Sequence, residues 1–598
     1  MDTVLLAQLE DAYLAARDAR DRLDVARARG EPANTHDLEA AAADTERRVR
    51  AKLVAIGATS QDPIATGSLA TSADEPAADR QNEDSRALDA IRAGVATALG
   101  EAGGLPVAPP ATRAECDDAQ AWTEAIRVGG NALRRRLDAC YGAVAQALDV
   151  NGEMLNRLQV LARLAAEPDE TRRRDLFLAL DPLWRTVDGD GGSSHSGSGT
   201  YTGVGTHGGV ATHAGAGEEA HRPSPYVALV RESAAQWWAG ASPIAANAAA
   251  LGVSEDEIEA WVVAILDAWR SLIVEPERAT GHPSIEPWDW WWRAGAGRQS
   301  LQVDLPRDAI LAVNRAVYAS LGADIDALGI VLDVTPRASR PAVPVAFTTF
   351  GGRPGPRPDG GWSRGRPTVL ATYVDGGLDE LAELVHETGH AIHLAAIHAR
   401  PAFTDWPASD ALTEALADLV AHDVTDIAWQ RRWLPTGTRV PNPPGIGAHG
   451  DGPGRDAVRA RYAGTVLDAA WTLFEIRQHA DPDRRPNDTW TEITAEWLGI
   501  APHPEWSWWA MRGQLIQEPG YMANYAIGAV LSADMRQAIR AARGDWMAGD
   551  PGWYAWVSER LYRFGLERSP ARVLGDLLGR TPTVDALLAD MAGTARRA

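Results

Sequence analysis

Apolar residues recur at helical spacing along most of this chain. Charged amphipathic helices are expected at Leu6–Arg29 and His36–Ile56, and helical patterning returns from about residue 86 to 186. It dominates again from residue 223 onward, for example over Ser254–Ile273. The spacing therefore predicts a mainly α fold.

Two short segments break this pattern. Val343–Phe350 and Thr368–Val374 are rich in Val, Thr, Phe and Tyr, which suit a pleated surface. A Gly/Pro-rich loop separates them. We expect them to form a small antiparallel ribbon.

Other segments lack regular patterning. Residues 59–85 are polar and read as a linker, and 435–455 form a Gly/Pro-rich loop. Residues 187–222 are of low complexity, rich in Gly, Ser and Thr. This stretch is either a weak metal-catching tract or a flexible insertion, and the insertion is favoured because its histidine spacings fit no compact site: His195, His207, His213 and His221.

Composition narrows the function classes. The net charge of −23 argues against nucleic acid or an anionic membrane as the main partner, since both require a basic footprint. The only cysteines, Cys116 and Cys140, provide neither a disulfide framework nor a cysteine zinc ribbon. No apolar run reaches membrane length, and no signal peptide is recognisable. We expect a cytoplasmic protein; the oligomeric state is not indicated.

The sequence His386-Glu387-Thr388-Gly389-His390 carries the candidate chemistry. It lies in Leu378–His398, a run with helical apolar spacing. Residues i and i+4 share one helix face, so both imidazoles can bind one zinc ion (Zn²⁺). Glu387 can then reach a water molecule at the metal and act as general base.

A third protein ligand is needed. His393 is excluded because positions i to i+7 of a straight helix span about 10 Å, whereas zinc–nitrogen bonds are about 2 Å. Glu414 is the only glutamate between His390 and Glu475, and it lies on a second expected helix, Ser409–Ala421. A carboxylate ligand from Glu414 would complete the site.

Asp418 follows Glu414 by one helical turn. It either orients a ligand histidine, as acids beside metal sites do, or is a solvated helix charge or cap. His398 and His422 have no comparable geometric argument and are expected to be structural or surface residues.

Several segments, in order along residues 286–535, resemble the thimet oligopeptidase and oligoendopeptidase F family. HETGHAIH at 386–393 resembles the family signature H-E-x-G-H-x-x-H, and EPWDWWW at 286–292 is similar to its P-W-D-x-x-Y-Y segment. EPGYMANYAIG at 518–528 resembles a tyrosine-bearing segment of that family and of the carboxypeptidase Taq family.

The resemblance implies a large, two-lobed, mainly α metallopeptidase with a deep central channel, zinc at its floor, and short unstructured oligopeptides as substrates. It implies that His386, His390 and Glu414 bind zinc, that Glu387 is the base, and that Tyr521 and Tyr525 stabilise the oxyanion. Two tyrosines on an apolar helix are otherwise core residues. Patterning, composition and this resemblance together divide the chain into an N-terminal helical region (1–186), the flexible insertion (187–222) and the zinc peptidase domain (223–598).

The same resemblance implies that the strand Val369–Val374 presents an edge to an extended peptide. The tryptophans of 288–292 are either an aromatic binding wall or core packing. The chain also departs from the family, because no histidine stands shortly before Tyr521; this leaves Arg512, Gln514 and Gln517 as replacement donors. A Taq-type exopeptidase and a peptide-binding protein with a residual zinc site are the alternatives.

Overall fold

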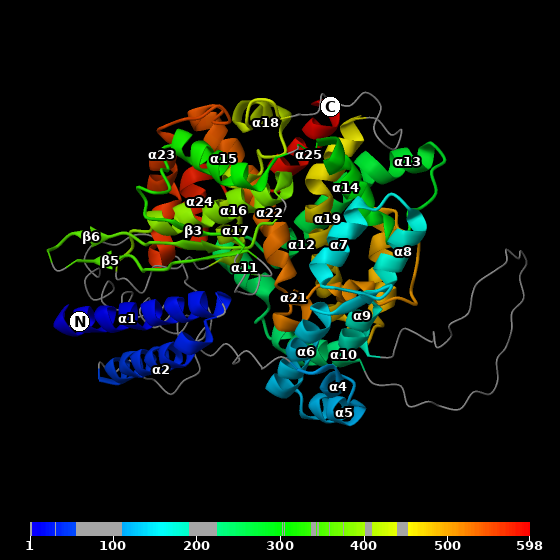
Figure 1. The fold of residues 1–598 in the computed structure, drawn as a ribbon, viewed down its shortest axis with the longest axis horizontal. Helices are drawn as coiled ribbons and strands as arrows, with labels where there is room; N and C mark the ends of the chain where they lie inside the picture. The colour runs from blue at the N-terminus through cyan, green and yellow to red at the C-terminus, as the bar shows by residue number, and fades with distance from the viewer. Residues whose placement is uncertain are drawn as a thin grey trace, which may run out of the picture.

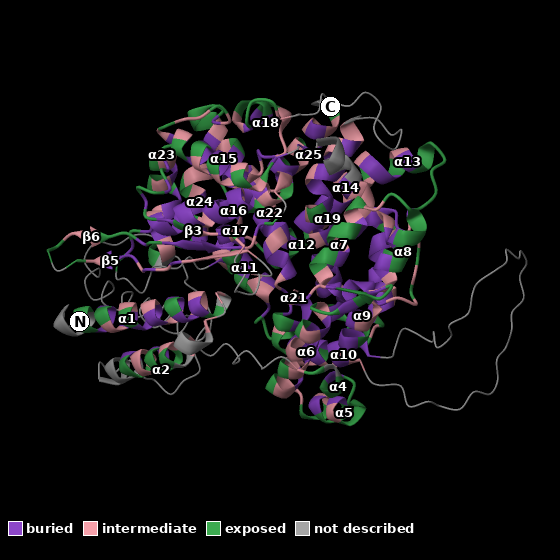
Figure 2. Cartoon of the chain, viewed as in Figure 1, coloured by how far each residue is buried: buried purple, intermediate pink, exposed green. Residues whose placement is uncertain are grey.

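The computed structural model confirms a mainly α fold with a few short strands (Figure 1). Its helices surround a buried centre (Figure 2). The residues that the structure describes are 3–29, 31–55, 111–189, 224–301, 303, 305–336, 343, 346–357, 359–374, 376–400, 409–438 and 453–597.

The helices fall into an N-terminal hairpin, a group before residue 190 and a larger group after residue 223. The hairpin consists of α1 (Thr3–Ala28) and α2 (Pro32–Ala55). The second group contains α4 (Arg113–Cys116), α5 (Ala119–Val128), α6 (Gly130–Ala145), α7 (Arg157–Ala166), α8 (Glu170–Leu178) and α9 (Asp181–Asp188).

The larger group begins with α10 (Pro225–Trp238), α11 (Pro243–Leu251), α12 (Glu255–Trp269), α13 (Glu275–Ala279), α14 (Asp289–Leu301) and α15 (Arg307–Ser320). It continues with α16 (Gly377–Ala396), α17 (Asp410–Ala421), α18 (Ile427–Trp433), α19 (Pro453–Ala480), α20 (Pro486–Ile493), α21 (Gln514–Gln517), α22 (Met522–Arg543), α23 (Trp553–Arg560), α24 (Pro570–Leu578) and α25 (Asp585–Arg597). Within the described residues, the expected helices are thus confirmed with end shifts of a few residues; residues 86–110 of the expected helical stretch lie outside the described part of the chain.

One hydrophobic core joins the second and third groups. Trp122, Leu133 and Val187 belong to the same buried cluster as Leu384 of α16 and Val530 of α22. The expected division at 187–222 stays a prediction, because residues 190–222 lie outside the described part of the chain, as do residues 59–85.

The α1–α2 hairpin has a small core of its own, made by Ala19, Leu23 and Ala42. It is tied to the body by ion pairs, of which the buried one joins Asp21 to Arg353, with Arg353 Nε 2.8 Å from Asp21 Oδ2. Figure 1 shows the hairpin beside the strands β5 and β6.

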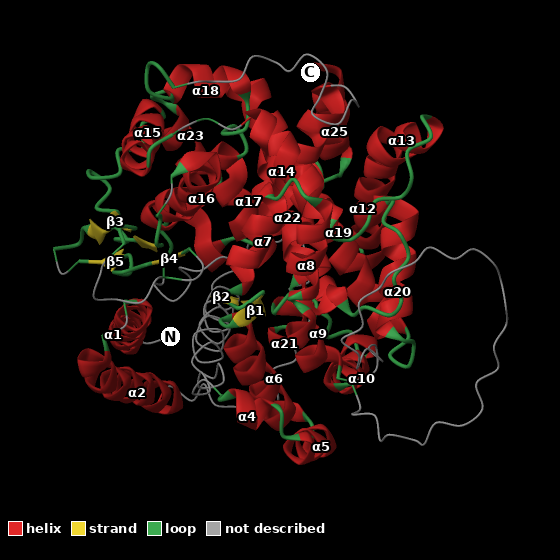
Figure 3. Ribbon diagram, turned by 45° about the vertical axis from the view of Figure 1, so that its right-hand side comes forward, coloured by secondary structure: helices red, strands yellow, loops and turns green. Residues whose placement is uncertain are grey.

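A three-stranded sheet lies against α16 (Figure 3). Its strands are β3 (Val331–Asp333), β7 (Thr368–Leu370) and β4 (Phe347–Thr349), in the order β3-β7-β4. Two-stranded ribbons are formed by β1 (Leu148–Val150) with β2 (Glu153–Leu155), and by β5 (Gly355–Pro356) with β6 (Trp362–Ser363).

The sheet confirms one expectation and corrects another. β4 and β7 pair antiparallel, with Thr348 opposite Val369, as the sequence predicted. The expectation that this second strand offers an edge is wrong for Thr368–Leu370, because β3 pairs with its other side in parallel. The outer edge next to α16 belongs to β4.

Cys116 and Cys140 form a disulfide between α4 and α6. Within the described residues, no helix is both long and apolar enough to cross a membrane. The expected cytoplasmic location stays a prediction, and the disulfide counts against it, since such bonds are rare in the cytosol.

Candidate metal centre

The helix that carries the motif starts abruptly at two glycines. Gly376 and Gly377 have φ of 81° and 89°, in the left-handed region that other residues avoid. Glu380 in the first turn accepts hydrogen bonds from the backbone N–H groups of Val374 (2.9 Å) and Gly376 (2.7 Å). This capping fixes where α16 begins, and therefore the direction of each side chain on it.

Two helices hold α16 from behind. From α15, the Tyr318 hydroxyl donates to the Val385 carbonyl at 2.6 Å, and Asn314 Nδ2 donates to Thr388 Oγ1 at 2.9 Å. From α23, the Tyr554 hydroxyl donates to the Ile392 carbonyl at 3.0 Å. These bonds fix the face of α16 opposite the histidines.

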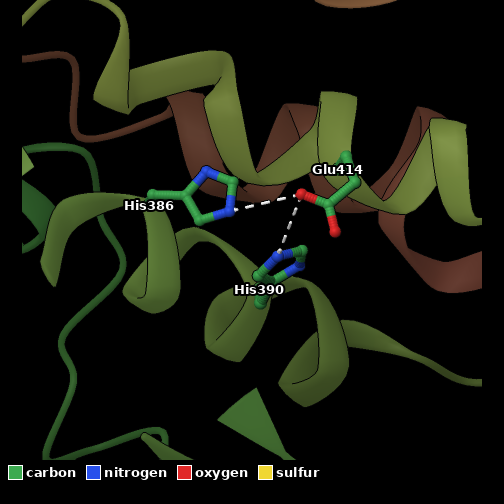
Figure 4. A group of neighbouring side chains, drawn as sticks. All are labelled: His386, His390 and Glu414. Carbon is green, nitrogen blue, oxygen red and sulfur yellow. Dashed lines mark ion pairs between the residues drawn. The ribbon is translucent and has the colours of Figure 1, made fainter. Parts of the chain in front are cut away.

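The structure brings together the three side chains predicted to bind metal (Figure 4). His386 and His390 point from α16 toward Glu414 on α17. Glu414 Oε2 lies 3.5 Å from His386 Nε2 and 3.9 Å from His390 Nε2. Ligand atoms about 2.1 Å from a tetrahedral ion are about 3.4 Å apart, so the donor set of two imidazoles and one carboxylate fits zinc.

Among the described residues, these three form the group whose possible ligand atoms all lie within 4.8 Å of one another. Burial and the charge of His386 hold the pKa of His390 well below its usual range, which keeps that imidazole neutral and able to bind a metal. The arrangement is thus a possible site for a divalent metal.

Gly389 lets the two ligand-bearing helices approach. A Cβ added at this position would lie 2.4 Å from the Ala417 carbonyl oxygen and 2.8 Å from Ala417 Cα. Both obstacles are backbone atoms of α17, so no side-chain rotation relieves the clash. Gly528 of α22 lies on the other side of α17, where a Cβ would be 3.3 Å from the Ala411 carbonyl oxygen and 3.4 Å from Glu414 Cβ, a tight contact but not a clash.

We therefore expect Gly389→Ala to separate α16 from α17, lower stability by about 1–3 kcal/mol and weaken metal binding. Gly464→Ala, in the middle of α19, is the matched control because a Cβ there meets nothing within 4 Å. Denaturant unfolding and metal titration of both variants measure the effect. Unchanged metal affinity in Gly389→Ala would show that the close helix approach does not build the site.

Asp418 lies next to a predicted ligand. Its Oδ1 is 2.7 Å from His386 Nδ1, which leaves Nε2 of that ring directed toward Glu414. Burial acts to lower the pKa of His386, but Asp418 and Glu414 overcome it and raise this pKa well above its usual range, so a metal ion that binds Nε2 must displace a proton from this ring. Of the two readings of Asp418, the geometry favours the one in which it orients His386.

Glu387 is 7% exposed and faces the sheet side of α16. Burial raises the pKa of its carboxyl group, while His386 and a hydrogen bond from Thr348 lower it in part. A carboxylate with a raised pKa is better matched to proton transfer near neutral pH. Glu387 therefore has the environment of a general base.

Tyr521 and Tyr525 lie at the start of α22, with ring centroids 5.6 Å apart. Burial and the negative charge of Glu414 raise the pKa of both phenols. Both are thus neutral hydroxyl donors that feel the charge of the third ligand. They lie on the Glu414 side of the centre and are only partly buried, unlike core tyrosines.

Of the three replacement donors, Gln514 hydrogen-bonds one of these tyrosines, and the Arg512 guanidinium lies over the ring of the same tyrosine, Tyr525, at 5.7 Å. Gln514 Nε2 donates to the Tyr525 hydroxyl at 3.4 Å. Arg512 is paired with Asp468, and Gln517 donates to Asp138 on α6 at 2.7 Å. Gln514 is therefore the one of the three that hydrogen-bonds the hydroxyl of a predicted catalytic tyrosine.

Glu475 holds the turn that carries Tyr521. It is buried on α19 and accepts a hydrogen bond from the Gly520 N–H at 2.6 Å. Its other oxygen has no hydrogen-bond partner. Burial raises the pKa of Glu475 to about 8, against the lowering effect of its backbone donors. With this pKa, the carboxyl group of Glu475 keeps its proton in the folded protein at neutral pH.

This carboxyl makes stability depend on pH. Between about pH 4.5 and 8 the unfolded chain has lost the Glu475 proton while the folded chain retains it, so stability falls as pH rises through this window. The free energy of unfolding should decrease by about 1.4 kcal/mol per pH unit, a few kcal/mol in all, and we expect Glu475→Gln to abolish this decrease. Urea unfolding at pH 5 and 8 measures it, with exposed Glu559→Gln as control. Parallel pH profiles of wild type and Glu475→Gln would contradict the protonated state.

Several other predicted residues are structural. His393 is 1% exposed, packs on Tyr562 and has its pKa lowered to about 3 by burial; it does not join the metal group. His398 stacks on Trp362. Trp288 and Trp290 are buried, which supports core packing over a binding wall.

Comparison with known proteins leaves the family open. No family model matches the chain, and no curated protein is similar to it. Solved structures with low similarity include a carboxypeptidase of Deinococcus radiodurans (14% identity, 99% of this chain and 98% of that chain, TM-score 0.46) and metallocarboxypeptidase 1 of Trypanosoma cruzi (13%, 99% and 99%, 0.45). Both of these proteins are named as carboxypeptidases, and neither is named as an oligopeptidase. At these TM-scores the similarity decides neither family nor activity.

Proposed function

We propose that this chain is a metal-dependent peptidase, with zinc as the metal and short unstructured oligopeptides as substrates. The observation that carries the proposal is the convergence of His386, His390 and Glu414 beside the buried carboxyl of Glu387. Two imidazoles and one carboxylate are the ligand set of catalytic zinc sites in peptidases, which keep one position open for water.

His386, His390 and Glu414 would hold the metal ion, and Asp418 would keep His386 in the correct tautomer. A zinc ion there supplies Lewis acidity toward a carbonyl oxygen and a water molecule. The carboxylate of Glu387 would take the proton of that water and return it to the leaving amine.

The tyrosines at the start of α22 would stabilise the developing negative charge. Their neutral hydroxyl groups feel the charge of the predicted ligand Glu414. Hydrogen-bond donors held in place before the reaction stabilise an oxyanion efficiently. Tyr521 is the first candidate and Tyr525 the second, because Gln514 already contacts the hydroxyl of Tyr525.

The outer edge of β4 would bind the peptide backbone. Within the described residues β4 pairs with β7 on one side only, and it contacts α16 beside the motif. An extended peptide that adds to an edge strand is bound through its main chain, so sequence preference is weak. We therefore expect a broad range of peptide substrates.

Cleavage of a mixed pool of unstructured peptides tests the proposal. We expect turnover that a chelator abolishes and zinc restores. Product masses and peptides with amidated C-termini separate internal cleavage from carboxypeptidase action, because only the latter needs a free terminal carboxylate. No turnover by a zinc-loaded protein, across peptides of varied length and both terminal states, would overturn the peptidase proposal in favour of a binding role.

A further inference from the structure

Thr348, on the edge strand β4, contacts the proposed base. Its Oγ1 lies 2.7 Å from Glu387 Oε2 and 2.9 Å from the Glu387 carbonyl oxygen. The two residues are 39 positions apart, so the contact exists only because the sheet packs against α16. It joins the strand next to the motif directly to the second residue of the motif.

A hydroxyl has one proton to donate, and an ionised carboxylate is a stronger acceptor than a carbonyl. The proton of Thr348 is thus directed to Oε2 of Glu387. This leaves the other carboxylate oxygen, Oε1, without that bond and available to a proton from water. A glutamate side chain has three rotatable bonds, and the bond from Thr348 removes the rotation that would exchange its two oxygens.

The support on both sides of this bond is rigid. Thr348 is in register with Val369 of the central strand β7, and β7 is in turn paired with β3. On the other side, α16 is fixed from behind by Tyr318 and Asn314. A hydrogen bond between two fixed elements sets a direction, whereas one between two mobile side chains does not.

We propose that Thr348 is a positioning residue for the reaction: its hydroxyl selects Oε2 of Glu387 as the anchored oxygen and leaves Oε1 as the proton acceptor. The inference rests on the proposed function, because it assigns Thr348 a role through Glu387. The side chain of Thr348 acts through Glu387, whose carboxylate it contacts.

Three substitutions test the role. Thr348→Val keeps the shape and removes the hydroxyl, and we expect kcat to fall about 10- to 100-fold with KM and zinc content unchanged. Thr348→Ser restores the hydroxyl and should recover kcat to within a few-fold of wild type. Thr123→Val is the matched control, since this exposed threonine of α5 hydrogen-bonds within its own helix, to the Ala119 carbonyl oxygen. Full kcat in Thr348→Val, or equal losses in the Val and Ser variants, would overturn the proposal.

A second measurement is independent of turnover. Denaturant midpoints are compared for Thr348→Val, Glu387→Ala and the double variant, and the hydrogen bond predicts that the two single effects are not additive. Additive effects would overturn the inference even in an active enzyme. Failure of wild type to cleave any peptide would instead overturn the proposed function. The comparison of the single and double variants would still report whether the Thr348 hydroxyl and the Glu387 carboxylate interact.

Discussion

Glu387→Gln is expected to lower kcat by about 10²- to 10⁴-fold while the protein still binds one metal ion. The amide is nearly isosteric with the carboxylate but cannot accept and return a proton. Its carbonyl oxygen can still accept the hydrogen bond that Thr348 donates to Oε2, so its NH₂ group would take the place of Oε1. The position that should receive the proton is thereby blocked, and the fold is retained.

The measurement is peptide turnover at saturating substrate by wild type and variant, each with its metal content determined. Glu559→Gln is the matched control, because it makes the same chemical change at an exposed carboxylate on α23. We expect that control to stay within a few-fold of wild type. Turnover above one tenth of the wild-type rate in metal-loaded Glu387→Gln would remove Glu387 from the role of base.

The parts of the site that depend on local periodicity could be predicted from the sequence. His386 and His390 lie one helical turn apart, and Glu414 and Asp418 repeat the same spacing on the next helix. Each helix also shows its boundaries, as where Ser409 accepts a hydrogen bond from the Leu412 N–H at 3.2 Å and begins α17. Spacing of this kind is a property of one element and needs no tertiary information.

Contacts between elements could not be predicted in this way. Asp418 and the histidine that it contacts are 32 positions apart, so the sequence left the role of Asp418 open between two readings, and Thr348 and Glu387 meet across a sheet–helix interface. The sequence shows Gly389 within the motif, but the reason for a glycine is the backbone of Ala417 on α17. Such residues are determined by the crossing of two helices, which periodicity does not encode.

The error about the edge strand has the same origin. Thr368–Leu370 has the composition of a strand, but composition does not say how many neighbours a strand has. Val331–Asp333 carries too short a signal to stand out, and its pairing closes the free side of β7. A central strand and an edge strand can have similar sequences, because what distinguishes them is the number of neighbouring strands.

Glu414→Ala is expected to cause the largest loss of metal affinity, because two imidazoles from one helix cannot complete a zinc site. Removal of a residue that only orients a ligand costs about 10- to 100-fold in affinity, and the loss from Glu414→Ala should exceed this range. Glu414 is about three-quarters buried, and its carboxylate oxygen lies nearer to His386 than to His390. Its removal therefore also takes away a charge that keeps His386 in place.

A graded series on α17 separates this role from a general effect of charge. Asp410, Glu414 and Asp418 lie at successive turns of one helix, so the variants Asp410→Ala, Glu414→Ala and Asp418→Asn each remove one carboxylate from the same element. Competition with a chelating indicator should rank the losses in affinity as Glu414 first, Asp418 second and Asp410 last. Equal losses across the series would mean that α17 attracts the ion by charge alone. Wild-type affinity in Glu414→Ala would require a third ligand from another part of the chain, and Glu414 would lose its assigned role.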